Sequence, residues 1–122
     1  MRRLALLCLV LAAGCGPRST DDWLARLKDP DVVKRREAVR ELAAREGEAE
    51  RVVPALTEAL ADENGYVRRD AAVALGKFGP EARPAVPALS AALKDRDANV
   101  RRAAAASLKK IDPQAAEKAG AR

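Results

Sequence analysis

The chain has 122 residues, of which 34% are charged, and its 23 basic and 18 acidic side chains give a net charge of +5. This length suits one domain. The sequence contains no histidine and only two cysteines, Cys8 and Cys15, neither of which we expect as a free thiol in the mature chain. It therefore lacks the usual zinc and copper ligands and the Ser-His and Cys-His nucleophile arrangements, so we expect no metal, no cofactor and no catalytic activity.

The amino terminus has the composition of an export signal. Arg2 and Arg3 precede an uncharged, mostly aliphatic run from Leu4 to Ala13. A basic start followed by such a run is typical of secretory signals, and the run is too short to cross a bilayer permanently by itself. The sequence therefore predicts a signal helix here.

The next residues, LAAGCG at positions 11–16, place small side chains before Cys15. This arrangement resembles the bacterial lipoprotein signal, which implies that lipid is joined to Cys15 and that residues 1–14 are removed. Several acyl chains on one cysteine hold a protein firmly at a membrane. Leu11 lies four places before the cysteine instead of the commoner three, so an ordinary secretory signal or a retained apolar helix is the alternative.

The lipoprotein resemblance implies a location in the bacterial cell envelope, lipid-anchored and facing the periplasm or the exterior. Removing residues 1–14 would leave 21 basic and 18 acidic side chains, a net charge of +3. Cys8 would leave with the signal and Cys15 would be acylated, so we expect no disulfide. Residues 15–20 are predicted to be a short polar tether, with Asp21 capping the first helix.

The rest of the chain repeats itself at an interval of 33 residues: VPALTEALADENGYVRRDAAVALGKFG at 53–79 is followed by VPALSAALKDRDANVRRAAAASLKKID at 86–112. A period of this size indicates a stacked array, in which each unit buries its apolar face against a neighbour. A looser copy precedes these two. The predicted repeat domain covers residues 21–119, in units at about 21–52, 53–85 and 86–119.

Within the middle unit, apolar residues recur every three or four positions on both sides of a polar break that contains Asp62, Asn64 and Gly65. The first run is Val53, Leu56 and Leu60, and the second is Val67, Ala71, Leu75 and Phe78. This spacing predicts two antiparallel helices per unit, and we expect Pro54 and Pro87 near the start of the first helix. The predicted fold is an all-α solenoid of three helical hairpins after the signal helix.

The pattern resembles the HEAT repeat, particularly the short version known from phycobiliprotein lyases. Its hallmark, an aspartate followed by Val-Arg and an alanine, is present as Asp62, Val67, Arg68 and Ala71, and again as Asp95, Val100, Arg101 and Ala104. The first unit departs from it, with Lys34 and Arg45 in the places of Val67 and Phe78. Polar replacements of this kind suit an end unit that faces water.

The HEAT resemblance implies a structural role for three arginines that each follow an aspartate by six residues. In such units the pair joins the turn to the second helix through a charge-assisted hydrogen bond. The expected pairs are Asp29 with Arg35, Asp62 with Arg68, and Asp95 with Arg101.

A neighbouring column of arginines has no obvious internal partner in the middle and last units. We predict a partner-binding face on the second helices, at residues 33–45, 66–78 and 99–111, although a merely solvated surface is the simpler interpretation. The candidate residues are Arg36, Arg69, Arg102, Tyr66, Lys77 and Lys110. Nucleic acid is an unlikely partner because Trp23, Tyr66 and Phe78 are the only aromatic residues.

The two ends of the array carry separate expectations. Trp23 occupies the column of Leu56 and is expected to cover the open end of the first hairpin. After Ile111 the polar tail DPQAAEKAGAR is expected to cover little of the last helix.

These observations predict an envelope-anchored adaptor that presents its second helices to a protein partner and has no catalysis of its own. A second hypothesis is a lyase-like accessory role in attaching a bilin chromophore to a client protein. Export, the small size and the absence of a free nucleophile count against it. The third is a purely structural array without a specific ligand.

Overall fold

A computed structural model describes residues 16–121 of the chain. The predicted signal and the lipidation site at Cys15 lie outside this range. Residues 16–121 form helices and contain no strand, which confirms the all-α prediction. The α-helices are α2 (Thr20–Arg26), α3 (Val32–Ala43), α4 (Ala49–Ala59), α5 (Gly65–Lys77), α6 (Val86–Ala92), α7 (Ala98–Ile111) and α8 (Pro113–Lys118), and the 3-10 helices are η1 (Glu46–Glu48) and η2 (Gly79–Ala85).

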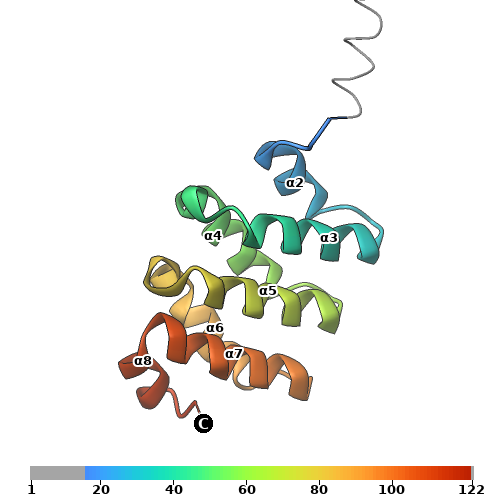
Figure 1. Cartoon of the computed structure of the whole chain (residues 1–122). Coiled ribbons are helices and arrows are strands. Elements are labelled where there is room, and N and C mark those ends of the chain that lie inside the picture. Colours follow the sequence, from blue (N-terminus) through green and yellow to red (C-terminus); the bar gives the residue numbers. More distant parts are fainter. Residues whose placement is uncertain (1–15, 122) are drawn as a thin grey trace, which may run out of the picture.

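The helices pair as hairpins, α2 with α3, α4 with α5 and α6 with α7. Figure 1 shows α3, α5 and α7 stacked side by side as one layer, with α4 and α6 behind them. This arrangement confirms the predicted solenoid. In the described part of the chain, every helix is too short or too polar to cross a bilayer.

The second helix of each hairpin begins at the same kind of cap. The side chains of Asp31, Asn64 and Asp97 accept hydrogen bonds from the N–H two residues further on, at 2.8, 2.9 and 2.7 Å. These bonds satisfy donors that have no partner within the helix. Because the three caps are spaced by 33 residues, α3, α5 and α7 start at equivalent points and stack in register.

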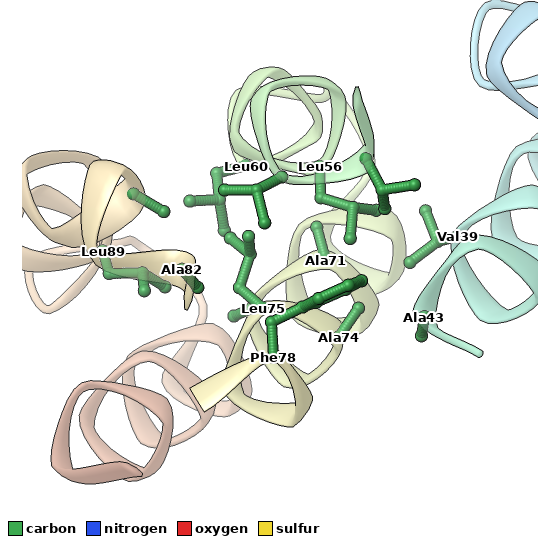
Figure 2. Close-up of a cluster of buried hydrophobic side chains, with 14 of the residues drawn as sticks. Val39, Ala43, Leu56, Leu60, Ala71, Ala74, Leu75, Phe78, Ala82 and Leu89 are labelled. Carbon is green, nitrogen blue, oxygen red and sulfur yellow. The ribbon is translucent and has the colours of Figure 1, made fainter. Parts of the chain in front are cut away.

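The core lies between the two layers and is continuous along the stack. Figure 2 shows Leu56 of α4 and Leu60 just after it facing Leu75 of α5 and Phe78 just after it, with Leu89 of α6 beyond. All five are at least 92% buried. Many of the remaining core residues are alanines, which let helix axes approach closely.

The start of the array differs from the prediction. Ser19, and not Asp21, caps α2: its hydroxyl accepts from the N–H of Asp22 at 3.2 Å, and the Asp22 carboxylate accepts from the N–H of Ser19 at 2.9 Å. Thr20 is buried, and its hydroxyl donates to the Glu48 carboxylate. The last residues of the predicted tether therefore belong to the folded array.

Three positions of the first unit behave as an end unit requires. Trp23 is only 6% exposed, and the guanidinium groups of Arg18 and Arg26 lie 5.3 and 5.8 Å from its ring centroid. Arg45, in the place of Phe78, donates to the carbonyl of Arg18 at 2.9 Å and so holds the entry to α2. Lys34, in the place of Val67, is exposed.

The prolines correct one predicted boundary. Helix α4 already begins at Ala49, before the expected unit start at residue 53, so Pro54 lies inside it, whereas Pro87 is near the start of α6 as predicted. The difference follows from Pro84, which stands where the preceding unit has Arg51. Proline cannot donate a backbone hydrogen bond, and residues 79–85 form the 3-10 helix η2 instead of extending α6.

The carboxyl-terminal tail also differs from its prediction, because it forms the additional helix α8. The Asp112 side chain accepts from the N–H of Ala115 at 3.1 Å, and Pro113 is the first helical residue. Ala116 of α8 is 2% exposed and Ile111 of α7 is 1% exposed. An aspartate cap followed by proline is a favourable helix start, and the tail packs against α7 instead of leaving it bare.

Candidate functional site

The predicted aspartate–arginine pairs exist, but they connect different groups from those expected. Arg35 donates through Nη1 to the backbone carbonyls of Asp29 and Pro30, at 2.9 and 3.1 Å. Its carboxylate partner belongs to the next unit: Nε lies 3.0 Å from Oδ2 of Asp62. The arginine therefore closes its own turn through the backbone and reaches the neighbouring repeat through its charge.

Arg68 repeats this arrangement one unit further on. It donates to the carbonyls of Asp62 and Glu63 at 2.9 and 3.1 Å, and to both carboxylate oxygens of Asp95 at 2.9 and 3.1 Å. Arg101 donates to the Asp95 carbonyl at 2.7 Å and has no carboxylate partner among residues 16–121. The expected pairing within one unit is thus wrong for the carboxylates. Together these bonds form a ladder that ties successive turns together.

The ladder also sets the ionisation of Asp95. Burial would raise the pKa of this carboxyl group, but hydrogen bonds from Arg68 and from the N–H of Asp97, with the charges of Arg68 and Arg96, outweigh burial and lower the pKa. Asp95 therefore stays ionised when its partner is in place. These arginines have a structural role.

The arginines of the second column occupy equivalent positions in the three repeats, but they have different hydrogen-bond partners. Arg36 donates through Nε to Oδ2 of Asp70 at 2.8 Å, and Arg69 donates to the other oxygen of the same carboxylate at 3.2 Å. Arg102 bonds within its own helix, to the Asn99 side chain at 2.8 Å. The expectation that Arg69 lacks an internal partner is wrong. Asp70 was missed because Ala103 occupies its position in the last unit.

Tyr66 lies at the centre of this column. Its ring is 59% exposed, and the guanidinium groups of Arg36 and Arg69 lie 5.0 and 5.7 Å from the ring centroid. Cation–π contacts of this kind hold two long basic side chains near one aromatic face. The structure therefore brings Arg36, Arg69 and Tyr66 together, and Lys77 lines the same pocket as Arg69. Arg102 and Lys110 lie on the next repeat.

Lys77 and Lys110 are exposed at the far ends of α5 and α7. They lie in one column, 33 residues apart, on the face that also carries Arg69 and Arg102. The large hydrophobic side chains exposed in the described residues are also on second helices, namely Val33 on α3 and Tyr66 and Val73 on α5. The second-helix face thus exposes basic and large apolar side chains next to one another.

A groove of about 460 Å³ runs along this face between α3 and α5. Arg40 and Val73, which the sequence analysis did not select, are part of its lining. The lining residues are Arg40, Ala43, Arg69, Asp70, Val73, Ala74 and Lys77. Val73 is a large apolar residue that lies outside the apolar run predicted to face the core. That mismatch was the signal that could have identified it.

The other pockets are less suited to binding a ligand. The one with a volume of about 570 Å³ lies at the turns between the first two hairpins, and its lining includes the ladder residues Arg35 and Asp62 and the solvated pair of Lys28 and Glu58. Residues 16–121 contain no cluster of three or more side chains that would coordinate a metal ion. The second-helix face is therefore the candidate site.

The arrangement of repeats is matched by known proteins. Residues 20–109 match the sequence profile of the HEAT repeats. A chain of the complex of CpcE and CpcF of phycocyanin lyase from Nostoc sp. PCC7120 is similar at 36% identity with a TM-score of 0.75, over 85% of this chain and 41% of that one.

An engineered protein of known crystal structure shares the fold, at 22% identity and a TM-score of 0.69, over 86% of this chain and 52% of that one. The chain thus spans about half or less of the length of these structural relatives. No curated protein matches it.

Proposed function

Because the chain belongs to the HEAT-repeat family, we propose that it is an adaptor, held at the bacterial envelope through lipid on Cys15, that binds a segment of another protein on its second-helix face. It has no catalytic activity of its own. One observation carries this proposal: the large apolar side chains that the described residues expose, Val33, Tyr66 and Val73, all lie on the second helices. Exposed apolar groups gathered beside charged ones are typical of interaction surfaces.

The rigidity of the face supports the same function. Asp62 and Asp95 each join two repeats, so the second helices keep a fixed spacing. A partner meeting such a surface would lose little free energy in ordering it, since preorganised surfaces reduce the entropic cost of binding. The lipid anchor would restrict the partner to the same compartment.

Photocrosslinking in intact cells tests the adaptor proposal. A photoreactive amino acid at Val73 should yield a discrete protein adduct, because Val73 is 46% exposed on the second-helix face. The same group at Ala91, exposed on α6 of the other layer, is the matched control and should yield none. Equal adducts at both positions, or no adduct at Val73, would contradict the proposal.

A second candidate function is a lyase-like accessory role in attaching a bilin chromophore. The 36% identity to a chain of the phycocyanin lyase complex favours it. Mixing the protein with bilin and a candidate phycobiliprotein client should then produce a covalent coloured product. If no colour is gained with any client, the lyase-like role is excluded and the adaptor function is retained.

A purely structural array is the remaining alternative. Replacing Arg69 and Arg102 together with alanine distinguishes it from an adaptor, because among residues 16–121 Arg102 bonds within its own helix and Arg69 shares Asp70 with Arg36. An adaptor should lose its protein partner in pull-down experiments while its helicity stays the same. Unchanged partners and unchanged helicity would favour the structural alternative.

A further inference from the structure

The groove between α3 and α5 has an apolar floor and a basic rim. Ala43 and Ala74 form the floor and are 5% and 2% exposed, while Val73 stands beside them at 46% exposed. Arg40 and Lys77 lie at the rim, one from each helix. A groove of this composition suits a ligand that carries both an apolar and a negatively charged group.

The charge of the groove is not balanced internally. Its one carboxylate, Asp70, is 10% exposed and is approached by Arg36 at 2.8 Å, Arg69 at 3.2 Å and Arg40 at 3.9 Å. One negative charge cannot neutralise three guanidinium groups. Arg40 makes the longest of these contacts and its side chain is 64% exposed, so its guanidinium is free to form a forked pair with an incoming carboxylate.

The positive surface continues onto the next repeat. Helix α7 contains no acidic residue between Ala98 and Ile111, and Ala103 stands where α5 has Asp70. Arg102 and Lys110 are both exposed there. Packed helix axes lie about 10 Å apart, and two extended residues four positions apart, whose side chains face the same side, lie about 13 Å apart, a span that the long arginine and lysine side chains can match.

Building on the proposed function, we infer that this groove binds an acidic linear segment of the partner protein, with two carboxylate side chains about four positions apart and an apolar side chain midway between them, because alternate residues of an extended segment face the same side. The first carboxylate pairs with Arg40 and Lys77. The apolar side chain packs on Val73 above the alanine floor. The second carboxylate reaches Arg102 or Lys110 on α7.

A peptide fits these features better than a membrane surface. Anionic headgroups would satisfy the basic rim, but a flat layer of headgroups does not enter a groove with a floor as deeply buried as Ala43 and Ala74. Val73 would then have no apolar partner. Anionic lipid is therefore an outcome of the test and not part of the inference.

Fluorescence anisotropy with the full chain in detergent tests the inference. The probe is a labelled extended peptide that carries two glutamates four positions apart with a leucine midway between them, so that all three side chains face the same side, and its control carries glutamines instead. The acidic peptide should bind and the glutamine peptide should not. Raising the salt from about 50 mM to about 300 mM should weaken binding, because exposed charges are screened.

Paired charge reversals locate the binding site. Arg40→Glu with Lys77→Glu should weaken peptide binding by about tenfold or more, since opposite-charge contacts become repulsive. Arg83→Glu with Lys94→Glu makes the same change in net charge at exposed positions away from the second-helix face and should leave binding within about twofold. Equal weakening by both pairs would overturn the inference.

A neutral variant guards against a folding defect in the reversed pair. Val73→Ala should weaken binding of the leucine peptide severalfold, yet leave a peptide with alanine at that place unaffected. If neither peptide responds to Val73→Ala, or if anionic phosphatidylglycerol vesicles bind and the peptide does not, the inference fails. The adaptor proposal stands or falls separately, on whether a crosslinker at Val73 captures a protein.

Discussion

Arg68 and Asp95 form a bidentate ion pair between neighbouring repeats, with Nε 2.9 Å from Oδ2 and Nη2 3.1 Å from Oδ1. Both side chains are nearly buried, at 8% and 12% exposed. Arg68 also fixes its own turn through two carbonyls. One side chain thus defines both the shape of a hairpin and its distance from the next, which makes the ladder a determinant of how the second helices are presented.

Arg68→Ala should lower the free energy of unfolding by about 3 kcal/mol, because it leaves the Asp95 carboxylate nearly buried without its partner. Urea denaturation followed by circular dichroism measures this loss. Arg101→Ala is the matched control. Arg101 occupies the same column but is exposed and has no carboxylate partner in the described chain. Its replacement should therefore lower the free energy of unfolding by only about 0.5 kcal/mol. Equal losses would show that the carboxylate contact adds nothing.

The lowered pKa of Asp95 predicts an acid-dependent loss of stability. A carboxyl group whose pKa is lower in the folded than in the unfolded state stabilises the fold above its unfolded pKa of about 3.9. That contribution should disappear as the pH falls through the lower, folded pKa. As the pH is lowered below about 3.9, the thermal midpoint of Asp95→Asn should therefore fall less steeply than that of the unchanged protein.

The matched control for the loss of a carboxylate is Asp112→Asn. Asp112 caps α8 and faces no arginine in the hydrogen bonds and ion pairs of the described residues. This variant should lower the thermal midpoint by losing a cap, and so measures how much the loss of one carboxylate hydrogen-bond acceptor destabilises the protein at neutral pH. A curve for Asp95→Asn that runs parallel to the wild type would contradict the prediction.

The ladder shows what the 33-residue period could and could not predict. The period correctly predicted stacked helical hairpins, because equivalent caps and apolar runs recur in the sequence. It did not predict that the Asp62 carboxylate binds Arg35 of the preceding unit, since the sequence separation of Asp29 and Arg35 suggested a pair within one unit. Which of two aspartates lies nearer depends on how the turns stack, and that is a property of three-dimensional packing.

The features that depart from the period were the hardest to predict. Asp70 has no acidic equivalent in the last unit, so its role between Arg36 and Arg69 was not recognised. The polar tail was expected to cover little of the last helix, although Asp112 followed by Pro113 is a recognisable helix start. Local chemistry, independent of the repeat, decides both features.

Gly76 on α5 permits a close approach of α5 to Ser107 of α7. A Cβ at this position would lie 2.5 Å from the Ser107 hydroxyl and 3.2 Å from the Ser107 Cα of α7. Gly76→Ala should therefore destabilise the protein by about 1–3 kcal/mol through overpacking, despite the higher helix propensity of alanine. Chemical denaturation of the full chain measures this loss.

Gly47 provides the matched control, because a Cβ there would meet no atom within 4 Å. Gly47→Ala should be neutral or stabilise by about 0.5 kcal/mol. Adding Ser107→Ala to Gly76→Ala should restore part of the lost stability, since the hydroxyl oxygen that meets the new methyl group is removed. If the two substitutions have simply additive effects, the close approach of α5 and α7 is not what limits position 76.

Cys15→Ser tests the predicted anchor directly. A serine cannot carry the thioether-linked lipid that a lipoprotein signal implies, and the cut in such a signal lies just ahead of the modified cysteine. The variant should therefore lose incorporation of labelled fatty acid and keep residues 1–14, whereas the unchanged chain should begin at an acylated Cys15. Intact-mass measurement after purification from membranes checks both.

Cys8→Ser separates the role of Cys15 from a general effect of losing a thiol. Cys8 lies in the apolar run that the signal would remove, and serine is small enough to leave that run largely apolar, so labelling and cleavage should continue. Recovery of the unchanged chain without lipid, from the cytosol, would refute the anchor. The repeats and their basic groove would then have to meet their partner inside the cell, where the same ladder would present the same face.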